Sequence, residues 1–300
     1  MRPVPHTLFP FEPHWHELGG HRMHYLDEGE GPPVVMVHGN PTWSFYYRNL
    51  VSALKADHRC VVPDHIGMGK SDKPRDAHYD YTLGQRVDDL EALLDHLDVR
   101  EDVTLVVHDW GGMIGMAWAA RHPERVARLV ILNTAAFPLP TERPFHWPLK
   151  LTRTPLGGLL VKRLNAFSEV AARTCVTRRP MPREVRRAYT APYDTPENRI
   201  ATLRFVQDIP LSPRDPGHAI VRETAERLHL FHDTPALVCW GEKDFVFDAP
   251  FLREWERHLP HAEVERFPDC GHYVLEDASD EILPRVRRFL TEHPLRSDVS

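Results

Sequence analysis

One aspartate, Asp109, stands where an apolar run meets a glycine-rich segment, in VVHDWGGMIGM (106–116). This pattern predicts a strand that turns sharply into a helix, a geometry that presents one side chain above a sheet. A carboxylate there is ionised at neutral pH and needs no base to act as a nucleophile, and its adduct is an ester or an anhydride of the enzyme. The alternative is an ordinary helix N-cap, because Asp is favoured at that position. Val107 is larger than the small residue usual in such turns.

Two residues near this turn carry hydrogen-bond donors suited to an anion. Asn40 lies in VHGNPTW, just after an apolar run, where the loop of such an architecture supplies N–H groups to an oxyanion. Its side-chain amide is a further donor, although Asn-Pro also favours an ordinary turn. Trp110 has one indole N–H and is either a donor that faces the site or a core aromatic. We expect Asn40 and Trp110 to bind the leaving group, with both structural alternatives open.

A histidine and an acid follow later in the chain. His272 comes after a glycine in FPDCGHYVLED, on a predicted loop near the C-terminus. The order Asp109, Asp244, His272 is the order of nucleophile, acid and histidine in enzymes that use such a turn. Asp244, in CWGEKDFVFD, is the expected partner that orients the imidazole, and Glu242 and Asp248 are the rival acids.

The elements that must position these residues alternate along the chain. Apolar runs bounded by turn residues predict buried strands at 33–39, 59–64, 103–109, 129–133 and 236–241. Helical patterns lie between them, at 81–98 and at 111–123, where a proline ends the second. This alternation predicts an α/β fold with a mostly parallel sheet and helices on both faces.

The alternation stops between Phe137 and Ser212, in a proline- and arginine-rich stretch with helical fragments. We expect residues 1–136 and 213–300 to form the core and residues 137–212 a helical cap over the strand ends, where open α/β sheets bind ligands. Several apolar cap residues either line a channel for alkyl chains or pack the cap: Phe145, Trp147, Leu149, Leu159, Leu160 and Phe167.

Composition narrows the class of protein. A chain of 300 residues suits one large α/β domain or one domain with an insert. The net charge of −6 offers no basic surplus for nucleic acid. The four cysteines lack CxxC spacing, so neither a zinc site nor a disulfide framework is indicated, and we expect no metal and no cofactor. The N-terminus lacks the pattern of a signal peptide, and no apolar window is long enough to suggest a transmembrane segment. We therefore expect a cytoplasmic protein.

Taken together, HGNPTW, VPDHIGMGKSDKP, HDWGG, GEKD and GH resemble the α/β-hydrolase fold and, within it, the haloalkane dehalogenase family over nearly the whole chain. The resemblance implies that Asp109 displaces a leaving group from carbon, that Asn40 and Trp110 hold the leaving anion, and that His272, with Asp244 as its acid, activates water. The combination of the asparagine in HGNP, Asn40, with an acid after the later strand, Asp244, is similar to the pattern of the branch of this family called subfamily III.

Within that branch, MVHGNPTWSFYYR, DHIGMGKSDKP and VVHDWGGMIGMA are most similar to the cis-β-lactone decarboxylases of bacterial olefin biosynthesis. This implies conversion of cis-3-alkyl-4-alkyl-β-lactones to cis olefins and CO2, and assembly with other enzymes of the pathway. Haloalkane dehalogenase activity is the alternative. Epoxide hydrolases share HDWGG but use two cap tyrosines, for which the chain offers Tyr189 and Tyr193. A non-catalytic binding protein is disfavoured, because nucleophile, acid, histidine and anion donors all occur in order.

Overall fold

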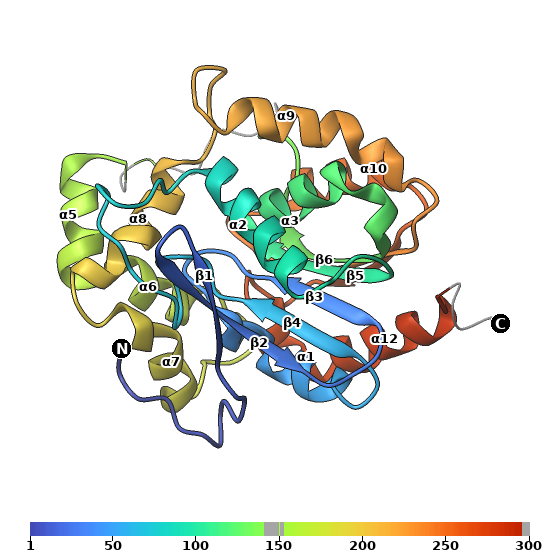
Figure 1. Ribbon diagram of the computed structural model, residues 1–300, viewed down its shortest axis with the longest axis horizontal. Coiled ribbons are helices and arrows are strands. Elements are labelled where there is room, and N and C mark those ends of the chain that lie inside the picture. Colours follow the sequence, from blue (N-terminus) through green and yellow to red (C-terminus); the bar gives the residue numbers. More distant parts are fainter. Residues whose placement is uncertain (141–149, 151–152, 296–300) are drawn as a thin grey trace.

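The computed structural model describes residues 1–140, 150 and 153–295 of the chain. In these residues eight strands form one sheet in the order β1-β2-β4-β3-β5-β6-β7-β8 (Figure 1). Every pairing from β4 to β8 is parallel, whereas β1 and β2 are antiparallel to their neighbours. The strands are β1 (His14–Leu18), β2 (His21–Glu28), β3 (Pro33–Val37), β4 (Arg59–Pro63), β5 (Val103–Asp109), β6 (Val126–Thr134), β7 (Ala236–Gly241) and β8 (Glu263–Phe267).

Helices cover both faces of this sheet, so the predicted mostly parallel α/β fold is confirmed (Figure 1). On one face α2 packs against α3, which in turn contacts α9, and on the other face α1 contacts α12. The helices outside the predicted cap are α1 (Arg48–Leu54), α2 (Leu83–His96), α3 (Trp110–Arg121), α9 (His218–Arg227), α10 (Ala249–His258), α11 (Val274–Asp277) and α12 (Ser279–Glu292). The five predicted strands and both predicted helices are present, with ends that differ by a few residues.

The N-terminal hairpin of β1 and β2 was not predicted. Its turn is Gly19-Gly20, and both glycines have positive φ angles of 55° and 83°. Gly-Gly is a strong hairpin signal because a tight two-residue turn needs positive φ at both central residues. The flanking sequence, HWHEL and HRMHYLDE, alternates too weakly in polarity to show strands by itself.

Among the described residues, four α-helices of eight residues or more lie between the C-terminal end of β6 and the start of α9, at the end of the sheet on the left of Figure 1. They are α5 (Pro155–Leu164), α6 (Ala166–Thr174), α7 (Arg183–Thr190) and α8 (Ile200–Gln207). We call α5–α8 the cap helices; the division at residues 136 and 213 stays a prediction. Three expected lining residues, Phe145, Trp147 and Leu149, lie outside the described residues.

Within the described ranges, no helix combines the length and apolar composition that crossing a bilayer requires.

Candidate active site

The turn from β5 into α3 holds Asp109 in an uncommon backbone conformation, with φ 52° and ψ −127°. Its side chain makes no capping hydrogen bond to α3, so the interpretation as an ordinary N-cap is wrong. A positive φ at a non-glycine residue is costly and is typical of functional sites, where the surrounding packing maintains it. The turn therefore presents the carboxylate away from the helix that follows.

Glycines make room for this turn. A Cβ at Gly111 would lie 1.9 Å from the Val37 carbonyl oxygen, and one at Gly39 would lie 2.0 Å from Asp109 Oδ1. The large Val107 is accommodated on α3 by Gly115, whose Cβ would meet a Val107 methyl at 2.8 Å. Gly115 in α3 thus leaves the space that Val107 needs in place of the small residue usual at that position.

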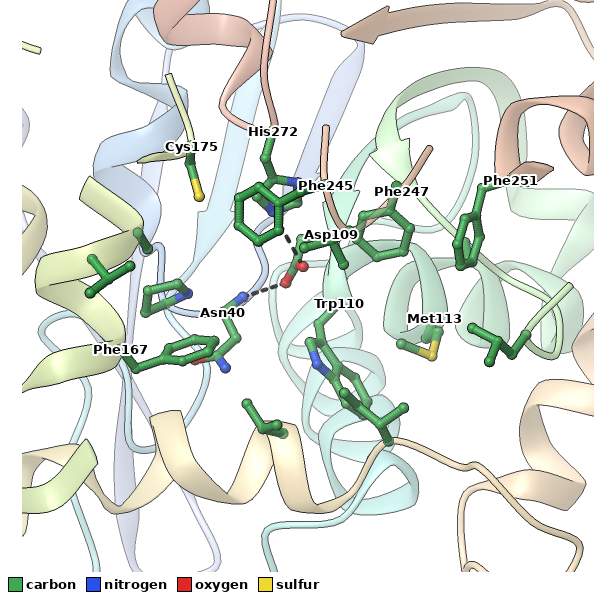
Figure 2. A pocket seen from close by; sticks show the side chains of 18 of the residues that line it. Asn40, Asp109, Trp110, Met113, Phe167, Cys175, Phe245, Phe247, Phe251 and His272 are labelled. Atoms are coloured by element: carbon green, nitrogen blue, oxygen red, sulfur yellow. Dashed lines mark hydrogen bonds and ion pairs between the residues drawn. The ribbon is translucent and has the colours of Figure 1, made fainter. Parts of the chain in front are cut away.

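Both carboxylate oxygens of Asp109 have partners (Figure 2). The backbone N–H of Asn40 donates to Oδ1 at 2.6 Å, and His272 Nε2 lies 3.4 Å from Oδ2. The side chain of Asp109 is 9% exposed, so these contacts replace most of its hydration. An ionised carboxylate in this position is held in one orientation with Oδ2 towards the histidine.

His272 is oriented by Asp244, as the sequence predicted. Nδ1 donates to Asp244 Oδ2 at 2.7 Å, and the same oxygen accepts from Asn133 Nδ2 at 3.0 Å. Asp244 Oδ1 accepts the N–H of Val246 at 2.7 Å. The rival acids are elsewhere: Glu242 pairs with Arg266 at the surface, and Asp248 precedes α10.

Asn133 was missed by sequence reasoning. Its amide also donates to the carbonyl of Gly241 and accepts the N–H of the same residue, which ties the end of β6 to the end of β7. The only signal in the sequence was a polar residue at the C-terminal end of a buried strand run. The hydrogen bond from Asn133 helps to hold Asp244 Oδ2 against His272.

The ion pairs set the charges of these groups. Burial alone would lower the pKa of His272, but the negative charges of Asp244 and Asp109 raise it to about 10. Burial acts to raise the pKa of Asp109, yet the hydrogen bond and the charge of His272 hold it below its usual value. At neutral pH the site therefore contains an imidazolium between two carboxylates.

The two expected anion donors flank the carboxylate. Asn40 Nδ2 donates one hydrogen bond to the Thr202 carbonyl of α8 at 3.0 Å, and its second N–H has no partner among the described residues. Figure 2 shows the indole nitrogen of Trp110 on the side of the ring that faces Asn40. The described residues offer this indole N–H no acceptor, although the ring is only 3% exposed. Two N–H groups thus remain for an anion beside Asp109.

These groups lie at one wall of a cavity of about 370 Å³, within the usual range for small-molecule sites. Most of the wall is apolar and comes from both the core and the cap helices, including Met113, Phe167, Phe247 and Phe251 (Figure 2). Of the expected cap residues, Leu160 and Phe167 line the cavity. Leu159 does not, because its side chain points outward and is 53% exposed.

The cap tyrosines do not reach this cavity. Tyr189 donates to Glu276 Oε1 at 2.6 Å, and Tyr193 donates to the Thr42 carbonyl at 3.2 Å. Both rings are buried, and neither lines the cavity. Neither hydroxyl is therefore placed to activate the oxygen of an epoxide bound in the cavity.

All four cysteines are buried free thiols: Cys60, Cys175, Cys239 and Cys270. Cys175 lines the cavity, where burial raises the pKa of its thiol well above the usual value, so it stays protonated. Within the described part of the chain, no group of three or more His, Cys, Asp or Glu side chains is arranged to hold a metal ion.

Comparison with known proteins agrees with this architecture. The family model described as alpha/beta hydrolase fold matches residues 32–279, so the chain belongs to the α/β-hydrolase fold family. A haloalkane dehalogenase structure from Bradyrhizobium elkani superimposes with a TM-score of 0.86 at 28% identity, covering 94% of this chain and 98% of that one.

The similarity is greater to two curated proteins, both named cis-3-alkyl-4-alkyloxetan-2-one decarboxylase. The protein from Shewanella oneidensis is 59% identical over 95% of this chain and 90% of its own length. The protein from Xanthomonas campestris pv. campestris is 53% identical over 92% of this chain and 94% of its own length. Within the α/β-hydrolase fold family, the chain therefore belongs to the family of these decarboxylases.

Proposed function

We propose that this protein converts cis-3-alkyl-4-alkyl-β-lactones into cis olefins and CO2. The observation that carries the proposal is a buried carboxylate, Asp109, flanked by two unengaged neutral N–H donors at the wall of an apolar cavity. Such a site suits a substrate with alkyl chains whose reacting carbon releases an anion. The names of the two decarboxylases from Shewanella oneidensis and Xanthomonas campestris pv. campestris support the same substrate class.

In the proposed mechanism Asp109 Oδ2 attacks ring carbon C4 and the C4–O bond breaks. The product is an alkyl ester of Asp109, and the released carboxylate, still attached to C3, occupies the anion site of Asn40 and Trp110. The bond between C3 and the carboxylate carbon then supplies the electron pair of the new double bond. CO2 departs, the ester C–O bond breaks, and Asp109 recovers its carboxylate, so that neither water nor a net proton is consumed.

The stereochemistry of this route is consistent with a cis olefin. Attack by Asp109 inverts C4, and anti elimination then removes CO2 and the aspartyl group from opposite sides. Inversion followed by anti loss gives the same alkene geometry as direct syn extrusion from the cis lactone.

On this route the imidazolium of His272 assists departure of the aspartyl group. Its Nε2–H faces Oδ2, the oxygen that becomes negative when the ester bond breaks. Asp244 keeps the imidazole charged and oriented.

Attack at the lactone carbonyl, C2, is the rival route and gives an anhydride. It needs an oxyanion hole, but the backbone N–H of Asn40 is already bonded to Asp109 Oδ1. The free donors of Asn40 and Trp110 instead suit a carboxylate released from C4. Hydroxylamine added during a single turnover tests this choice, because an anhydride would yield more substrate hydroxamate than the free lactone forms in the presence of Asp109→Asn, and the alkyl ester would not.

The decisive assay supplies a synthetic cis-3,4-dialkyl-β-lactone and follows the products by gas chromatography with mass spectrometry. We expect cis olefin and CO2 in equal amounts. In H2¹⁸O, Asp109 should remain unlabelled after many turnovers. A β-hydroxy acid as product, with label entering Asp109, would assign a hydrolase instead.

A haloalkane dehalogenase is the second candidate, favoured by the structural match to a dehalogenase. Both reactions begin with displacement of an anion from an sp3 carbon, so a bromoalkane is the matched comparison substrate. We expect far slower release of bromide and alcohol than of olefin. Assembly with other pathway enzymes in the cytoplasm stays a prediction; co-purification with a thiolase-like condensing enzyme would test it.

A further inference from the structure

A buried arginine lies behind the anion site, outside the residues that line the cavity. Arg86 of α2 is fully buried, and its Cζ lies 3.7 Å above the ring centre of Phe205 and 5.9 Å from that of Trp110. Phe205 belongs to the cap helix α8 and also contacts Trp110, with ring centres 5.2 Å apart. The indole of Trp110 thus packs against a cap aromatic that is itself covered by a guanidinium.

The same cap helix holds the other anion donor. The Thr202 carbonyl, one helical turn before Phe205, accepts from the Asn40 amide. Helix α8 therefore contacts both Asn40 and Trp110. Arg86 links α8 to the core through Phe205 and through Asp208, whose Oδ2 lies 3.5 Å from one guanidinium nitrogen.

The charge of Arg86 is incompletely balanced. One nitrogen, Nη1, donates to the Tyr81 carbonyl at 2.7 Å, whereas Nε and Nη2 have no hydrogen-bond partner among the described residues. The contact with Asp208 Oδ2, at 3.5 Å, is at the limit of hydrogen-bond distance, and burial raises the pKa of Asp208 to about 6 even though Arg86 acts to lower it. A guanidinium stays protonated in proteins, so a positive charge with two unbonded nitrogens remains close to the indole.

We propose that Arg86 is a positioning residue that acts through Trp110. With Phe205 it fixes the indole, and its buried charge strengthens the anion site that Trp110 and Asn40 form. Charge in a poorly solvated interior acts over several ångströms, and a cation near an indole makes its N–H a better donor. The identity of the anion during turnover, a carboxylate released from the lactone, rests on the proposed function. The affinity of the site for an anion does not rest on it.

Bromide binding tests the proposal without turnover. Saturable quenching of tryptophan fluorescence by bromide is measured for the folded protein, and Trp110→Phe should remove that saturable component. Arg86→Met, which keeps the length of the side chain and removes the charge, should weaken bromide binding about tenfold. Arg86→Lys keeps the charge and should restore binding to within about threefold of the original protein.

Asp208→Asn separates charge from packing. It retains the shape of Asp208 and removes the negative charge beside Arg86, so bromide should bind about two- to fivefold more tightly. A purely structural role predicts weaker binding in both variants, because each loosens the contact between α2 and α8. Weaker binding in Asp208→Asn, or unchanged binding in Arg86→Met, would overturn the proposal; if Arg86→Met does not fold, Asp208→Asn decides alone.

A kinetic measurement with the β-lactone then extends the result. Because the lactone is neutral, Arg86→Met should lower kcat while KM changes little. A change confined to KM would assign Arg86 to substrate binding and contradict the proposal. Absence of lactone turnover in the original protein, with the bromide pattern intact, would refute the proposed function and leave the role of Arg86 standing.

Discussion

The two sides of the cavity differ in what they contribute. The core side, at the C-terminal ends of the strands, carries the charged groups, Asp109, His272 and Asp244, with backbone positions fixed by the sheet. The cap side contributes mostly apolar side chains, such as Leu160 and Phe167 from short helices. From this difference we expect the sheet side to determine which reaction occurs and the cap helices to contribute to which substrates fit, with α8 as the element that contacts both Asn40 and Trp110.

The largest effect is expected on the core side. Asp109→Asn keeps the shape of the side chain but removes the proposed nucleophile, so kcat should fall by about 10⁴-fold or more. Olefin formation by the purified protein is the measurement, and an unchanged circular dichroism spectrum is the control for folding. Turnover close to that of the original protein would show that the core side does not supply the covalent step.

The ion pairs of His272 predict a dependence on pH. A pKa near 10 in the folded state lies above the value of 6.5 in an unfolded chain, so protonated His272 stabilises the fold fully below pH 6.5. This stability is lost as the pH rises through about 10. Asp244→Asn removes the main cause of the raised pKa and should flatten the dependence, by an amount of order 3 kcal/mol in the free energy of unfolding.

Urea unfolding at pH 6, 8 and 10 checks this expectation, and Asp244→Asn should also lower kcat by about 10²–10⁴-fold. Glu242→Gln is the matched control, since it changes the rival acid two residues away, which pairs with Arg266 at the surface. If Glu242→Gln caused the larger loss, the assignment of the acid would be wrong.

The core side was also the more predictable side. Buried parallel strands are near-continuous apolar runs, so Val103–Asp109 and Ala236–Gly241 could be placed from sequence. Residues after such strands meet at one edge of a sheet, which explains why Asp109 and Asp244 could be paired with a histidine 28 residues beyond the acid. The position of these site residues could therefore be predicted from their order in the chain and from the direction of the strands.

The cap side and the supporting contacts were not predictable in the same way. Whether an apolar cap residue faces the cavity depends on the rotation of a short helix, so Leu159 and Leu160 could not be distinguished. Asn133 and Arg86 act through contacts 111 and 119 residues away in sequence, with Asp244 and Phe205. No local pattern reports such contacts, because they exist only after the sheet and the cap have packed.

A cap-side substitution should change the substrate range more than the chemistry. Phe167 lines the cavity (Figure 2), so Phe167→Ala should shift the preferred alkyl-chain length and change kcat/KM by about tenfold for a given lactone. Leu159→Ala, on the neighbouring helix but 53% exposed, is the control and should leave the profile unchanged. A series of lactones of increasing chain length is the measurement. Equal effects of the two substitutions would mean that Phe167 acts on cap stability and not on fit.

The smallest effect on activity is expected from a buried cap tyrosine, Tyr189. Tyr189→Phe removes a hydrogen bond to Glu276, which also pairs with Arg48, so the free energy of unfolding should fall by about 1–3 kcal/mol. Because the hydroxyl is directed away from the cavity, olefin formation should stay within about twofold of the original rate. Tyr193→Phe, which loses a weaker bond to the Thr42 carbonyl, is the matched comparison and should cost less stability. A large loss of turnover in both variants, with stability intact, would place the two hydroxyls in the reaction and assign part of the chemistry to the cap.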